Sequence, residues 1–126
     1  MTKNFNDLAL AILRIGFSAG MLTHGIPKLS RLENPSTFPD PLGVSPTISL
    51  ILTLIMEIVA PILIIIGLKT KLAAIPVAIT MFVAAFIVHG SDPWAKKEMA
   101  ILYLIAFVVI ALAGPGRYAI DGRKGR

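Results

Sequence analysis

The sequence contains four long apolar segments, which restrict the chain to a helical, membrane-spanning fold. They cover about residues 7–25, 46–68, 71–89 and 93–113. Roughly 20 helical residues cross a hydrocarbon layer of ~30 Å, so each segment with its flanking residues can span a bilayer. None alternates polar and apolar residues, as the strands of a membrane barrel do. We therefore predict an all-α fold, an integral membrane four-helix bundle.

The composition agrees with this prediction and narrows the partners. Of the 126 residues, 56% are hydrophobic and 15% are charged, and a soluble domain of this size cannot bury so much apolar surface. The length allows one domain, residues 1–126. The net charge is +5, and the basic residues that produce it flank apolar segments. This position favours an interaction with phospholipid headgroups over one with nucleic acid. The absence of cysteine excludes disulfides and thiol redox chemistry from the chain.

Turn residues and basic residues predict the topology. Ser45 and Pro46 are typical of a helix start, and prolines between residues 26 and 45 rule out a continuous helix there. Loops are expected over about residues 26–45 and 90–92. Seven basic residues share the side of the termini, whereas four lie in these two loops. The seven are Lys3, Lys69, Lys71, Arg117, Arg123, Lys124 and Arg126; the four are Lys28, Arg31, Lys96 and Lys97. The positive-inside rule then places both termini in the cytoplasm and both loops in the periplasm.

Two charged residues lie deep within the apolar segments. Counted along each helix, Arg14 is ~10 Å from the cytoplasmic end and Glu57 ~16 Å from the outer end, so their depths nearly coincide in a ~30 Å core. Because an unpaired charge at this depth is costly, we expect Glu57 to be buried, to face the first segment and to pair with Arg14. Pro61 removes the helical donor to the carbonyl of residue 57. The pair, together with His24, is a candidate for proton handling, with a structural ion pair as the alternative.

Polar side chains also gather at the expected outer helix ends. We expect His24, Lys28, His89 and Glu98 to converge on one cavity that opens towards the periplasm. Such groups could hydrogen-bond a quinone or another ligand. The two histidines could instead ligate haem, which is the less favoured alternative, and no metal site is predicted because no surrounding ligand pattern is visible.

Four stretches carry a resemblance to a known family. They are "LRIGFSAGMLTHGIPKL", "MEIVAPILIIIGLKTKLAA", "VHG" at 88–90 and "GPGRYAIDGR" at 114–123. In order and separation they resemble the DoxX family of small bacterial membrane proteins (DoxX/DoxD-like). Pro61 stands where such proteins often have glycine. The resemblance implies a multi-pass, four-helix protein of the bacterial inner membrane.

The resemblance also implies an association with redox chemistry. A DoxD-like member is a subunit of a thiosulfate:quinone oxidoreductase, and others accompany membrane oxidoreductase complexes in oxidative-stress defence. The favoured interpretation is the membrane subunit of a quinone-linked oxidoreductase complex, with a soluble or membrane redox partner and with homo-oligomerisation open. The alternatives are a non-catalytic anchor or assembly protein and, least favoured, a small transporter or proton-conducting element. The chain contains no complete catalytic motif, so whether it is itself an enzyme stays open.

Overall fold

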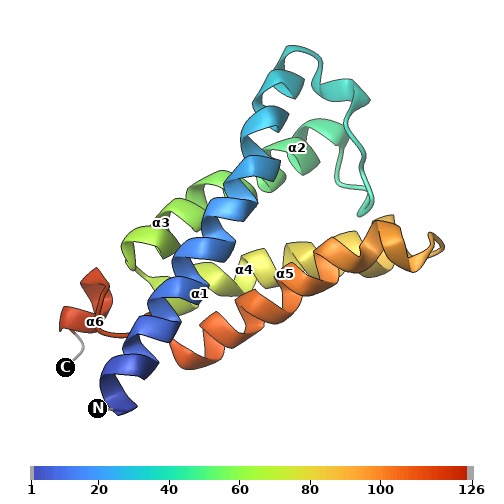
Figure 1. Cartoon of the computed structure of the whole chain (residues 1–126). Coiled ribbons are helices and arrows are strands. Elements are labelled where there is room, and N and C mark those ends of the chain that lie inside the picture. Colours follow the sequence, from blue (N-terminus) through green and yellow to red (C-terminus); the bar gives the residue numbers. More distant parts are fainter. Residues whose placement is uncertain (1, 125–126) are drawn as a thin grey trace.

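Helix α1 (Thr2–Gly25) crosses the whole molecule and contacts the second and fourth apolar segments. The structure, a computed structural model (Figure 1), describes residues 2–124 and the side chains of residues 5–122. Arg126, which was counted for topology, lies outside the described residues. The buried face of α1 is a stripe of residues spaced three or four apart, as expected for one side of a helix. Its members are Asp7, Ala11, Arg14, Ser18, Met21 and Gly25.

The second apolar segment is one continuous helical rod with a wide turn at its centre. It consists of α2 (Pro46–Leu54), the π-helical turn η3 (Ile55–Val59) and α3 (Ala60–Ile66). Ser45 caps α2 by accepting a hydrogen bond from the N–H of Ile48, and Pro46 is in its first turn, which confirms the predicted start. Pro61 has no N–H to bond the carbonyl of residue 57, and Ala60 bonds the carbonyl of Ile55, five residues back.

The third and fourth segments form an antiparallel pair. The third is α4 (Thr70–Val83) followed by the π-helical turn η4 (Ala84–Val88), and the fourth is α5 (Trp94–Ala113). Small side chains cover the buried face of the third segment, among them Ala74 and Ala78 of α4 and Ala85 of η4, and Ala106 and Phe107 of α5 are buried too. Small residues let membrane helices approach closely, and α4 and α5 form the most extensive helix contact in the molecule.

The segment predicted as a loop over about residues 26–45 begins with a 3-10 helix, η1 (Ile26–Glu33), which continues directly from α1. With three residues per turn, residues 26, 29 and 32 lie on one face, and Ile26, Leu29 and Leu32 are all exposed. The outer apolar surface of α1 therefore extends into η1. The short η2 (Pro35–Thr37) then leads back towards α2.

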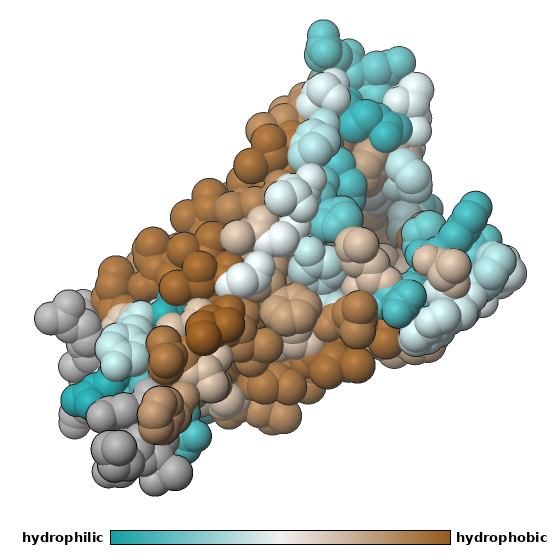
Figure 2. Space-filling view, viewed as in Figure 1, coloured by the Kyte–Doolittle hydropathy of each residue, from teal (hydrophilic) through white to brown (hydrophobic). Residues whose placement is uncertain are grey.

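Two arms diverge at the end of the molecule that is far from α6 (Ile120–Lys124) (Figure 1). One arm consists of η1, η2 and α2. The other consists of η4 and the first turns of α5. Figure 2 shows a notch between them with hydrophilic residues on its walls, whereas hydrophobic residues cover much of the rest of this face. Polar groups of this end therefore line the notch as well as the tips of both arms.

Three helices are long and apolar enough to cross a membrane: Phe5–Glu33, Pro46–Ile66 and Thr70–Val88. The chain is thus all-helical over its described residues and has the character of a membrane protein. Helix α5 is equally long, but Lys96, Lys97 and Glu98 occupy its first turns. Its crossing of the membrane, and the cytoplasmic location of both termini, stay predictions.

Candidate functional site

Both arms contribute to one small pocket where they join. Its volume is about 140 Å³. The residues that line it come from α1, η1, η3, α4 and α5, and they are Met21, His24, Lys28, Glu57, Met81, Met99, Ala100 and Tyr103. The pocket therefore combines an acid, a base, an imidazole and a phenol with apolar walls.

The charged part of the pocket is an ion pair between Lys28 and Glu57. The Lys28 ammonium donates to both carboxylate oxygens of Glu57, at 2.8 Å and 3.0 Å. The Glu57 side chain is 5% exposed, whereas the Lys28 side chain is 35% exposed. The carboxylate is thus buried in the bundle, and its partner reaches it from the more open side.

The local backbone explains how these two side chains meet. Glu57 lies in the wide turn η3, and the end of α1 packs directly against this turn. A Cβ atom added at Gly25 would lie 2.6 Å from the carbonyl oxygen of Glu57 and 2.8 Å from its Cβ. Only glycine therefore allows this approach, after which η1 brings Lys28 to the carboxylate. π-helical turns in α-helices are frequent at functional sites.

Aromatic contacts hold the other polar groups of the pocket. The ring of Tyr103 contacts the rings of His24 and Phe17 edge to face, each with a centroid separation of 5.6 Å. It also stacks on Phe107 at 6.3 Å. A Cβ atom at Gly20 would lie 2.4 Å from the Tyr103 hydroxyl oxygen, so that hydroxyl lies against the backbone of α1. Tyr103 is therefore fixed beside His24 at the edge of the pocket.

The predicted pair between Arg14 and Glu57 is wrong. The Arg14 guanidinium is buried, with a relative exposure of 1%, but it donates to backbone carbonyls of Ile64, Ile65 and Tyr118. Carbonyls at a helix C-terminus lack helical partners and carry partial negative charge, so the end of α3 is a suitable acceptor. The depths were misjudged because α1 continues into η1, which places Glu57 opposite Gly25 and Arg14 opposite Ile64.

Arg14 instead belongs to a second polar cluster, at the end of the molecule near α6. There the segment after α5 returns to the bundle. The N–H of Arg117 donates to Asp7, the carboxylate of Asp121 accepts from the N–H of Thr70 at the start of α4, and the N–H of Asp121 donates to the carbonyl of Gly67. Arg14 is therefore a structural tie between α1, α3 and this segment, and it does not reach the pocket.

The structure brings together only two of the four residues expected at the outer cavity. His24 and Lys28 line the pocket, whereas His89 and Glu98 do not. Nδ1 of His89 lies 2.8 Å from a carboxylate oxygen of Asp92 instead. The pKa of Asp92 is lowered, mainly by the hydrogen bond with His89, although desolvation opposes the shift. The convergence of both histidines on one cavity was therefore predicted wrongly.

Sequence reasoning missed Tyr103 and the three methionines of the pocket. Charged residues stand out in apolar segments, whereas methionine is indistinguishable from other core residues. Tyr103 did offer a signal, because it is the one hydrogen-bonding side chain between Ala100 and Ala113. Buried tyrosine hydroxyls usually require a polar neighbour, which could have placed it near the other polar groups.

These features define a small helical membrane protein with a polar pocket inside an otherwise apolar bundle. The family model for DoxX matches residues 9–90, and the chain belongs to the DoxX family. It is 32% identical over 128 residues to an uncharacterized protein of Haemophilus influenzae, covering 96% of this chain and 94% of that one. No solved structure matches the chain. The matched residues include residues 9–25 of α1, the Lys28–Glu57 pair and His89.

Proposed function

We propose that this protein is the membrane subunit of a quinone-linked oxidoreductase complex of the bacterial inner membrane, and that the pocket binds the quinone head group. The observation that carries the proposal is the Lys28–Glu57 pair, which shares a pocket of about 140 Å³ with His24 and Tyr103. Burying an ion pair inside an apolar bundle costs desolvation free energy. Intramembrane ionisable residues commonly mark proton or substrate pathways.

The chemistry of the pocket suits a quinone. Reduction of a quinone to a quinol takes up two electrons and two protons, so its site needs donors near the carbonyl oxygens. The Lys28 ammonium is a hydrogen-bond donor, and His24 and Glu57 are groups that can exchange a proton. Met21, Met81 and Met99 supply adaptable apolar walls. The chain carries no nucleotide-binding motif, so a redox partner supplies the electrons.

The roles of the individual residues follow from their exposure. Lys28 is partly exposed and contacts the carboxylate of Glu57, so it can pass a proton inward from its exposed side. Glu57 is the buried acceptor of that proton. His24 lies against Tyr103 and is a second donor in the pocket. Arg14 has no part in this proposal because it is bound to backbone carbonyls elsewhere.

The test is direct binding of a quinone to purified full-length protein in lipid nanodiscs. The probe is tail-less 2,3-dimethoxy-5-methylbenzoquinone, measured by equilibrium dialysis. Glu57→Gln and Lys28→Met are expected to weaken binding roughly tenfold or more, because each removes a group that contacts the pocket. Asp92→Asn is the matched control, since it disrupts the His89–Asp92 pair outside the pocket and is expected to leave binding unchanged.

Absence of quinone binding by the unaltered protein would contradict the proposal. If the protein nevertheless co-purified with a redox enzyme, the alternative of a non-catalytic anchor would hold. In that case Glu57→Gln would change stability only, and the activity of the whole complex would follow the amount of folded subunit.

A further inference from the structure

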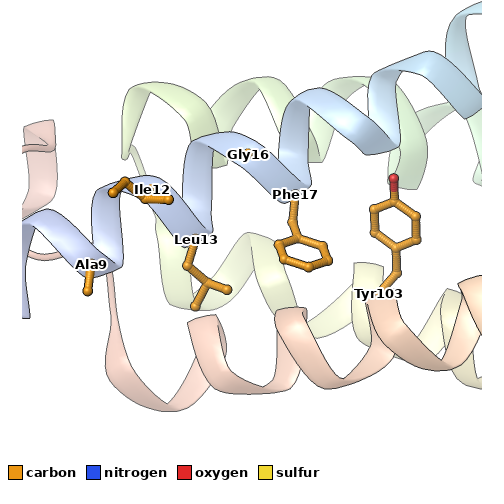
Figure 3. Close-up of a pocket in the computed structure, with 6 residues that line it drawn as sticks. All are labelled: Ala9, Ile12, Leu13, Gly16, Phe17 and Tyr103. Carbon is orange, nitrogen blue, oxygen red and sulfur yellow. The ribbon is translucent and has the colours of Figure 1, made fainter.

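An apolar groove lies on the outer surface between α1 and α5. Its volume is about 590 Å³. Figure 3 shows that Ala9, Ile12, Leu13, Gly16 and Phe17 of α1 line it together with Tyr103 of α5. From residue 9 to residue 17 the helix rises ~12 Å. The groove is therefore an elongated apolar channel that faces the hydrocarbon region along α1.

Tyr103 connects this groove to the polar pocket, because it lines both. Its ring packs edge to face on Phe17, which lines the groove, and on His24, which lines the pocket. Figure 3 shows its hydroxyl directed towards α1. One side chain of α5 thus lies at the boundary between the polar pocket and the apolar groove, which are built on consecutive stretches of α1, residues 9–17 and 21–24.

We propose that the groove binds the isoprenoid tail of a lipid-soluble ligand whose head group occupies the pocket, with Tyr103 beside the point where the tail meets the head group. This inference rests on the proposed function and extends it, because it makes the ligand an amphiphile that enters from the bilayer. A tail gains little from the hydrophobic effect when it leaves lipid for protein, so shape complementarity must hold it. Gly16 supplies that shape, since no atom lies within 4 Å of the position of its missing Cβ.

The charge balance of the pocket favours an isoprenoid quinone over a phospholipid as the ligand whose tail lies in the groove. The Lys28 ammonium donates to both oxygens of Glu57, so the pair is already neutralised. A phosphate group would have to compete with a buried carboxylate for that ammonium. An uncharged head group with carbonyl acceptors can be accommodated without breaking the pair.

The experiment compares two probes on the full chain in nanodiscs: tail-less 2,3-dimethoxy-5-methylbenzoquinone and the same ring with two isoprenoid units. The unaltered protein is expected to bind the tailed quinone roughly tenfold more tightly. Gly16→Leu fills the centre of the groove and is expected to abolish that ratio while leaving the affinity for the tail-less ring unchanged. Ala9→Leu fills one end of the groove and is expected to reduce the ratio.

Ala19→Leu is the matched control, because it adds comparable bulk to an exposed position of α1 that does not line the groove. It is expected to leave both affinities unchanged. Equal affinity of the unaltered protein for the two probes would overturn the tail site while the head-group proposal survived, and failure to bind either probe would overturn both. A co-purified phospholipid that is retained by the unaltered protein and lost with Gly16→Leu would identify an acyl chain as the occupant and would also overturn the inference.

Discussion

Two buried charged side chains in this bundle are stabilised in different ways. Glu57 has an ionic partner, Lys28, whose side chain is the more exposed of the two. Among the described residues, Arg14 donates to no acid and relies on carbonyl oxygens from the end of α3 and from Tyr118. Because the planar guanidinium presents five donors in a fixed fork, it can join two separate backbone segments, which a lysine ammonium does less well.

A double-mutant cycle tests this division of partners. Lys28→Met and Glu57→Gln are expected to show a coupling free energy of about 0.5–3 kcal/mol, since the two groups are in direct contact. Arg14→Gln and Glu57→Gln are expected to be additive to within about 0.5 kcal/mol, because they share no partner. The measurement is the free energy of unfolding in mixed detergent micelles. Strong coupling in the Arg14 cycle would contradict the observed contacts.

At the level of elements, the turn before α2 is organised by Asp40. Its carboxylate accepts from the N–H groups of Val44 and Ser45 and from the hydroxyl of Ser49. Desolvation raises the pKa of Asp40, but the hydrogen bonds from Ser49, Ser45, Val44 and Gly43 together outweigh it, so the pKa is lower than usual. The charged form is therefore the one that holds this turn.

The sign of the pH dependence follows from that shift. A carboxylate with a lowered pKa in the folded state contributes stability above its unfolded pKa of ~3.9 and loses the contribution as the pH falls through the lower folded value. Asp40→Asn is expected to lower the Tm at pH 7 and to reduce the loss of Tm between pH 5 and pH 3. Glu33→Gln, an exposed carboxylate in the same connection, is the control and is expected to leave the profile unchanged. Identical profiles for Asp40→Asn and the unaltered protein would contradict this role.

The helices and the burial of Glu57 could be predicted from sequence, whereas the register between helices could not. Apolar length and turn residues mark where helices begin and end, and the cost of an exposed charge requires Glu57 to face inward. The relative height of two helices depends on close packing, here of Gly25 against the turn around Glu57. That contact shifts α1 against the second segment and gives Glu57 a lysine in place of the predicted arginine.

At the level of the whole molecule, one end of the bundle is open and the other is closed. One end opens into a notch with polar walls (Figure 2), and the other is closed by the segment after α5. With the predicted orientation, the notch faces the periplasm and the closed end faces the cytoplasm. Under the proposed function, protons would enter the pocket from the side of the notch.

The orientation can be measured by labelling single cysteines. Replacements at Lys69, in the turn between α3 and α4, and at Lys96, in the first turns of α5, lie at opposite ends of α4 and α5. Membrane-impermeant maleimide is expected to label the position-96 cysteine from the periplasm in intact cells and the position-69 cysteine only after lysis. Labelling of both in intact cells would contradict four membrane crossings.

The segment after α5, which closes the end of the molecule near α6, also affects the order in which the bundle assembles. Residues 117–121 follow α5 in the chain, so Asp7 and Arg14 enter the membrane long before Arg117, Tyr118 and Asp121 have been synthesised. The first helix is therefore inserted before its hydrogen-bond partners at Arg117 and Tyr118 are available. A chain stopped within α5 would therefore leave the buried Arg14 without the carbonyl of Tyr118, one of its acceptors.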